Sequence, residues 1–137
     1  MKSQKTILIY EMKKEKEKKI LELCGKKQIA VRTVQLSEYG QSLGSLAKIS
    51  GILKNETREE KTLLGEEMMV FSGMDRNEMD LFLEEYKNMG IAPVALKAIL
   101  TPYNIFWNTR QLYEELQKER RSFHQAERTI LTEKSVP

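Results

Sequence analysis

Residues 68–90 read MMVFSGMDRNEMDLFLEEYKNMG and contain the pattern of a strand, a turn and a helix. The first five residues carry no charge, which is typical of a strand that is covered on both faces. The helix is predicted by apolar residues at i, i+3, i+4 and i+7, namely Met79, Phe82, Leu83 and Tyr86. This stretch therefore predicts a buried strand that leads directly into an amphipathic helix.

Both ends of this helix carry recognisable signals. The Asp75 carboxylate can accept hydrogen bonds from the free backbone amides of the first turn, and Glu78 completes a capping box three residues later. Gly90 lies where a glycine commonly ends a helix. Asn108 and Gln111 repeat the capping-box spacing further along the chain. These signals predict one helix over residues 75–89 and the start of another near residue 108.

The same alternation of strands and helices extends outward in both directions. Strands are predicted at 5–11, 28–35, 68–72 and 92–100, and helices at 12–27, 42–53, 75–89 and from 108 to about 121. The polar stretch 56–67 is predicted to be a surface loop. Strands that alternate with helices are typical of an α/β fold with a parallel sheet.

Charge placement predicts the order of the strands. The runs at 7–10 and 68–71 are wholly apolar, as central strands are. The strands at 28–35 and 92–100 contain Arg32 and Lys97, which suit edge strands. We therefore expect a four-stranded, mainly parallel sheet of order 2-1-3-4 with helices on both faces, in three layers. The order 3-2-1-4 and a sheet with an antiparallel edge strand remain open.

The chain has 137 residues, of which 40% are hydrophobic and 31% charged, as expected for one globular domain. We expect residues 1–122 to form this domain, and 123–137, which have little apolar periodicity, to be a frayed or extended tail. No apolar run approaches the roughly 20 residues of a membrane helix. The run at 7–10 is also too short for a signal peptide. We therefore expect a cytoplasmic protein without membrane contact.

The second half of the chain carries a family resemblance. The stretches VFSGMD (70–75), LKAILTPYN (96–104) and LYEEL (112–116), together with Trp107, resemble a small bacterial domain of unknown function, family number thirty-seven eighty-three. The resemblance covers about Met68 to Phe123, and Thr-Pro-x-Asn-x-x-Trp after a strand is its most specific part. It implies a bacterial, cytoplasmic protein, and it brings no activity, ligand or catalytic residue.

The usual signatures of catalysis do not assemble in this sequence. A serine or cysteine nucleophile usually needs an adjacent base, and the only histidine, His124, falls in the predicted tail. The only cysteine, Cys24, lies on the apolar face of its helix and is predicted to be a buried, inert thiol. No glycine-rich phosphate loop follows the first strand. We therefore expect no catalytic residue, no metal and no cofactor.

One alternative is a metal-dependent hydrolase or nuclease. Glu11 would end the first strand and Asp75 would begin the helix after the third strand. In a parallel sheet both carboxylates would face the same rim, where they could hold Mg²⁺. The helix cap explains Asp75 equally well.

A second alternative is weak nucleic-acid binding through the basic helix at 12–27, which contains KKEKEKK at 13–19. Glutamates interrupt this run and no aromatic residue accompanies it, so we do not expect nucleic acid as the main partner. Lys13 and Lys16 nevertheless oppose the helix dipole in the first turn. They would suit a small anionic partner.

The segment Thr101 to Trp107 (TPYNIFW) is the main candidate for function. Ligands of open parallel sheets sit beyond the carboxyl ends of the strands. We expect Thr101, Asn104 and Trp107 to lie on this rim beside Ser72 and Gly73 of the third strand. We thus predict a non-catalytic module that binds a partner protein or a small molecule, with a second copy of the chain as one candidate partner.

Overall fold

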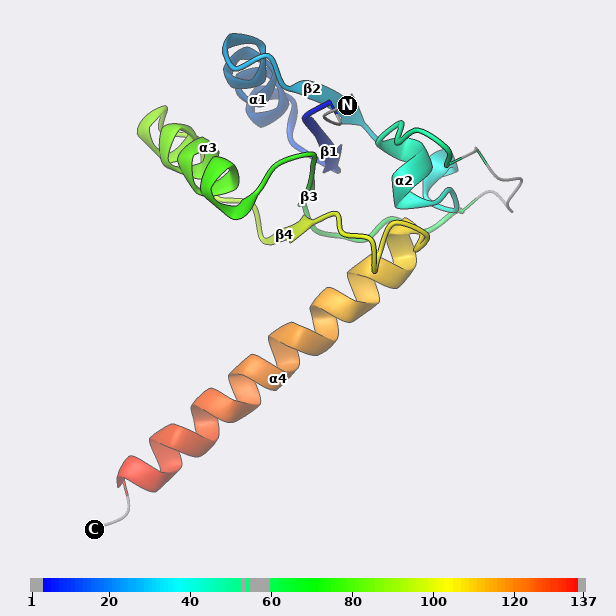
Figure 1. Cartoon of the computed structure of the whole chain (residues 1–137). Helices are drawn as coiled ribbons and strands as arrows, with labels where there is room; N and C mark the ends of the chain where they lie inside the picture. Colours follow the sequence, from blue (N-terminus) through cyan, green and yellow to red (C-terminus); the bar gives the residue numbers. More distant parts are fainter. Residues whose placement is uncertain (1–3, 53, 55–59, 136–137) are drawn as a thin grey trace.

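The computed structural model describes residues 4–52, 54 and 60–135, with side chains up to residue 123 (Figure 1). Its elements are β1 (Thr6–Tyr10), α1 (Lys14–Lys26), β2 (Ala30–Thr33), the 3₁₀ helix η1 (Leu36–Glu38), α2 (Leu43–Leu46), β3 (Met68–Ser72), α3 (Arg76–Asn88), β4 (Leu96–Ile99) and α4 (Thr109–Ser135). All four predicted strands are present, and the α/β class is confirmed.

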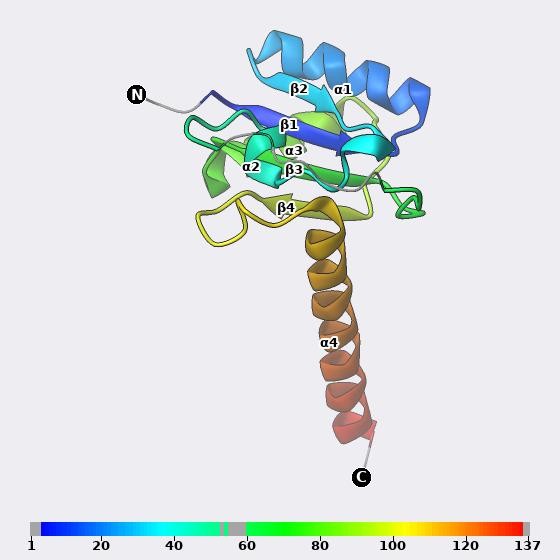
Figure 2. The ribbon, with the colours of Figure 1, turned by 90° about the vertical axis from the view of Figure 1, so that its right-hand side faces the viewer.

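The four strands form one sheet in the order β2-β1-β3-β4, which confirms the predicted order. The two uncharged strands, β1 and β3, are central, and every residue in them is buried. Arg32 and Lys97 lie on the edge strands β2 and β4. Figure 2 shows the strands in this order from top to bottom.

The strand directions differ from the expected mainly parallel sheet. The pairs β1–β2 and β3–β4 are parallel, but the central pair β1–β3 is antiparallel, with Thr6 opposite Ser72 and Tyr10 opposite Met68. The alternative of a sheet with an antiparallel edge strand is also wrong, because the antiparallel pair lies at the centre of the sheet and not at its edge. An uncharged strand between two others looks the same in either direction, so the residue pattern could not reveal the reversal. The carboxyl ends of β1 and β3 consequently lie at opposite ends of the sheet.

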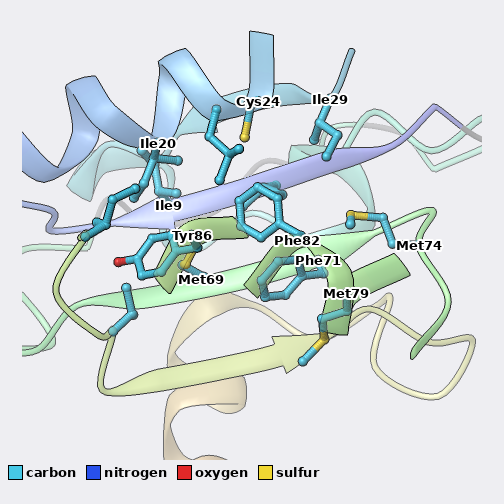
Figure 3. Close-up of a cluster of buried hydrophobic side chains, with 14 residues drawn as sticks. Ile9, Ile20, Cys24, Ile29, Met69, Phe71, Met74, Met79, Phe82 and Tyr86 are labelled. Atoms are coloured by element: carbon cyan, nitrogen blue, oxygen red, sulfur yellow. The ribbon is translucent and has the colours of Figure 1, made fainter. Parts of the chain in front are cut away.

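Successive residues of the central strands pack on opposite faces. Ile7 and Ile9 of β1 join Phe71 and side chains of α1 and α3 in one apolar cluster, shown in Figure 3. Leu8 and Tyr10 join a second cluster that includes α2 and the first turns of α4. Apolar side chains thus cover both faces of the sheet.

The predicted helix caps are confirmed. The Asp75 carboxylate accepts from the Glu78 amide at 2.8 Å, and the Glu78 carboxylate accepts from the Asp75 amide at 3.3 Å. Asn108 and Gln111 make the same reciprocal pair, both at 2.9 Å. Gly90 has a φ of 73°, the left-handed conformation expected just after a helix.

Two helices differ in length from their predictions. The helix expected over 42–53 is only α2, because Lys48 (φ 58°) and Gly51 (φ 87°) turn the backbone out of the helical region. The last helix was expected to end near Arg121, but α4 continues to Ser135 and projects from the body beyond β4 (Figures 1 and 2). The apolar pattern fades there, while Glu, Lys, Arg and Gln favour helix on propensity alone. None of the described helices combines the length and the apolar character needed to cross a bilayer.

Candidate functional site

The 101–107 loop is held by hydrogen bonds from its own polar side chains. The Thr101 hydroxyl oxygen accepts from the backbone amides of Tyr103 (3.2 Å) and Asn104 (3.3 Å). The Asn104 Oδ1 accepts from the Thr101 amide at 2.8 Å, and its Nδ2 donates to the Ile99 carbonyl at 3.1 Å. Asn104 is only 8% exposed and Thr101 is partly buried. These two predicted site residues therefore shape the loop.

The other half of the loop is fixed against α2. The backbone amides of Leu43 and Gly44 donate to the carbonyls of Trp107 and Ile105, each at 2.8 Å. A Cβ atom at Gly44 would lie 3.0 Å from the Ile105 oxygen, tighter than most Cβ contacts, so glycine eases this close approach. The loop is thus tied at both ends to elements of the domain.

Large aromatic side chains point outward from this fixed backbone. Tyr103 is 81% exposed and Phe106 is 71% exposed. Trp107 is partly buried against the α2 side of the core, and its ring meets that of Tyr103 edge-on with centroids 5.4 Å apart. The site residues predicted from the sequence omitted Tyr103 and Phe106. The excess of aromatic residues in the loop was the signal that pointed to them.

Ser72 and Gly73 lie at the same end of the sheet as the loop, because the Leu100 amide donates to the Phe71 carbonyl. Ser72 is 2% exposed, so its hydroxyl is enclosed by the domain. Gly73 has a φ of 73°, and a Cβ atom there would lie 2.7 Å from the Gln4 carbonyl oxygen. Gly73 permits this close approach between the chain ends of β1 and β3.

The prediction that Glu11 and Asp75 face the same rim is wrong, because β1 and β3 run antiparallel. Five residues of strand, about 16 Å, separate the two ends of the sheet. The Glu11 carboxylate instead accepts from the Tyr39 hydroxyl (2.7 Å) and the amides of Leu64 (2.7 Å) and Gly65 (3.0 Å). Glu11 therefore anchors the chain that leads into β3, and Asp75 caps α3.

The predicted anion-binding residues Lys13 and Lys16 meet Glu67 at the start of α1. The Lys16 ammonium pairs with the Glu67 carboxylate at 2.5 Å and donates to the Pro93 carbonyl at 3.2 Å. The Lys13 amide donates to the same carboxylate at 3.3 Å, while its side chain is exposed. Glu67 thus offsets the unfavourable interaction of the Lys16 charge with the helix dipole. The two residues are 51 positions apart in sequence, and the residue pattern did not predict their contact.

Glu66 forms a second anchor, which holds α4 to the chain before β3. Its carboxylate accepts two bonds from Arg120 (3.0 and 2.9 Å), one from the Tyr113 hydroxyl (2.9 Å) and one from the Gln117 amide (2.8 Å). The Arg120 guanidinium, with the help of Tyr113 and Gln117, lowers the pKa of the Glu66 carboxyl to about 2. The Arg120 guanidinium is therefore already paired.

Cys24 is buried on the inner face of α1, as predicted, and burial raises the pKa of its thiol to about 12. His124 lies outside the residues whose side chains are described. Within the described part of the chain, no three His, Cys, Asp or Glu side chains are grouped so that they could hold a metal ion.

Comparison with known proteins adds one finding. Neither a curated protein nor a solved structure matches this chain. A family model does match, from one residue before β3 through α3, β4 and the 101–107 loop into α4. The resemblance seen in the sequence is thus confirmed: residues 67–123 match DUF3783, a domain of unknown function.

Proposed function

We propose that this protein is a binding module that presents the 101–107 loop to a partner protein and catalyses no reaction. The observation that carries the proposal is the exposure of Tyr103 and Phe106 on a loop with a fixed backbone. The proposal includes the bacterial source and the cytoplasmic location that the family resemblance implies.

Exposed aromatic rings on a fixed loop suit protein recognition for two reasons. Aromatic residues contribute a large share of the binding energy at protein interfaces. A backbone that is already ordered also loses little conformational entropy on association. In this proposal Tyr103 and Phe106 make the contact, Trp107 supports Tyr103 from behind, and Thr101 and Asn104 keep the loop in shape. Gly73, which is exposed at the same end of the sheet, forms the adjoining edge of the surface, whereas Ser72 is buried and makes no contact in this proposal.

The two alternatives receive less support from the geometry. A metal-dependent hydrolase would need Glu11 and Asp75 at one rim, and they lie at opposite ends of the sheet. A nucleic-acid surface would use the cations of the basic helix, but Lys16 is paired with Glu67, and glutamates interrupt the exposed lysines around it.

A photo-crosslinking experiment tests the proposal. A photoreactive phenylalanine analogue replaces Phe106 in one variant and Leu81, which is 57% exposed on α3, in a matched control. We expect irradiated cells to yield a discrete adduct for position 106 that is absent for position 81. The captured protein is then purified, and its affinity is measured by calorimetry for the wild type, Phe106→Ser and Leu81→Ser.

The expected result is one-to-one binding that Phe106→Ser weakens at least tenfold, in the range of an aromatic interface residue, while Leu81→Ser leaves it unchanged. Equal affinity of the wild type and Phe106→Ser would contradict the proposal. The absence of any adduct specific to position 106 would contradict it as well.

A further inference from the structure

A pocket of about 400 Å³ lies at the other end of β4, between the end of α3 and the chain that enters β4. Its wall is mainly apolar and includes Met69, Leu83, Ile91 and Val94. Lys87 of α3 and Lys97 of β4 are the charged residues of the lining. An apolar pocket with a few polar groups converging on it is the usual form of a small-molecule site, and this volume lies in the typical range.

The two lysines of this pocket differ from two other lysines of the domain, Lys16 and Lys27. Lys16 and Lys27 pair with Glu67 and Glu85. Among the described side chains, no carboxylate forms an ion pair with Lys87 or Lys97. Lys97 donates one bond, to the Val94 carbonyl at 3.3 Å, so its ammonium retains two further donors.

The surroundings of the pocket add to its positive charge. A second hollow of about 380 Å³ shares Ile91 with the pocket, and its charged lining consists of Glu15 and four lysines, Lys13, Lys14, Lys16 and Lys19. Lys16 is neutralised by Glu67, whereas Lys13, Lys14 and Lys19 are exposed. A negatively charged group in the apolar pocket would therefore meet Lys87 and Lys97, and the adjoining hollow carries more lysines than carboxylates.

We propose that this pocket binds a small amphipathic carboxylic acid, with its apolar body against Leu83, Ile91 and Val94 and its carboxylate between Lys87 and Lys97. The apolar wall accounts for the body of the ligand, and the two lysines account for its charge. The site is separate from the 101–107 loop, which follows the opposite end of β4. Either proposal can fail without the other.

Calorimetric titration of the purified chain tests the site with defined probes. Decanoate and 2-naphthoate present the same carboxylate on two differently shaped apolar bodies. Decan-1-ol lacks the charge, acetate lacks the apolar body, and decyltrimethylammonium reverses the charge. We expect saturable one-to-one binding of at least one of the first two, with weaker binding of decan-1-ol and none of acetate or decyltrimethylammonium.

Variants then locate the binding. Lys87→Met and Lys97→Met should each weaken binding of the carboxylate about fivefold, the effect of one partly exposed charge pair. Lys18→Met removes an exposed charge from α1 outside the pocket and should leave binding unchanged. Leu83→Glu should weaken binding of the carboxylate probe more than tenfold through like-charge repulsion, whereas Leu83→Gln should weaken that binding less.

Lys87 lies in the last turn of α3, where its positive charge also stabilises the helix. The melting temperature of every variant is therefore measured, to separate loss of binding from loss of fold. Three outcomes would overturn the proposal. These are no saturable binding of either carboxylate, equal affinity for decanoate and decan-1-ol, and binding that is unaffected by Leu83→Glu in a folded variant.

Discussion

Two aromatic pairs in this molecule have nearly the same geometry and opposite surroundings. Phe71 and Phe82 meet edge-on with centroids 5.7 Å apart and an interplanar angle of 72°, and both are fully buried. Tyr103 and Trp107 meet at 5.4 Å and 70°, yet Tyr103 is almost entirely in solvent. Ring geometry alone therefore does not reveal what an aromatic pair does. Burial separates a pair that stabilises the domain from a pair that is open to a partner.

The largest effect is expected in the buried pair. Phe82→Ala should lower the free energy of unfolding by about 4 kcal/mol, because it removes a buried ring and leaves a cavity between α3 and the sheet. Urea denaturation followed by circular dichroism measures this loss. A loss below about 1 kcal/mol would mean that the buried pair contributes no more to the stability of the domain than the exposed pair.

The next effect concerns the residue that shapes the exposed loop. Asn104→Ala should cost about 2 kcal/mol, because it leaves the Thr101 amide and the Ile99 carbonyl without their partner. Thr101→Ala removes a partly exposed acceptor and should cost less. Thermal and urea unfolding of the two variants give the comparison. Equal stability of Asn104→Ala and wild type would mean that the loop does not depend on this residue.

The chain after the loop continues into α4, which Glu66 holds in place. Because the folded pKa of Glu66, about 2, is below its ordinary value of 4.5, its contribution to stability is present above about pH 4.5. This contribution is lost as the pH falls toward 2. Glu66→Gln should therefore reduce the difference in unfolding free energy between pH 5 and pH 2.5.

Glu114→Gln is the matched control for this pH effect, since Glu114 is exposed on the same helix. Urea denaturation at several pH values compares both variants with the wild type. If Glu66→Gln and the wild type lose the same stability on acidification, the Glu66 anchor does not hold α4.

The smallest effect is expected for the two exposed rings of the 101–107 loop, of which Tyr103 belongs to the aromatic pair compared above. Phe106→Ser and Tyr103→Ser should each change the free energy of unfolding by less than about 0.5 kcal/mol, because both rings are largely in solvent already. The melting temperature is the measurement. A loss comparable to that of Phe82→Ala would show that these rings contribute to the stability of the domain.

The features that the sequence predicted correctly depend on short-range patterns. The uncharged runs of β1 and β3, the edge charges Arg32 and Lys97, and both capping boxes are visible within a few residues. The strand order followed from the first two of these. The reversal at the centre of the sheet leaves no such local mark, and it alone separates Glu11 from Asp75.

The features that were missed depend on contacts between distant residues. The stretch before β3 was predicted to be only a polar surface loop. Its Glu66 and Glu67 instead bind α4 and α1, and its Leu64 and Gly65 amides bind Glu11. Composition shows that such residues are charged, but only the folded chain shows which cation or amide each one meets. For the same reason the pocket lysines Lys87 and Lys97 could not be told apart from the paired Lys16.

The antiparallel pairing of β1 with β3 also has a consequence for folding order. On either side of it lies a unit of the same make-up, a five-residue strand, a 13-residue helix and a four-residue strand that pairs in parallel with the first. Within the first unit, paired residues such as Thr6 and Ala30 are 24 positions apart, whereas Tyr10 and Met68 across the centre are 58 positions apart. Closing the longer loop costs more chain entropy. We therefore expect the two units to form from nearby residues first and the antiparallel pairing between them to complete the sheet last.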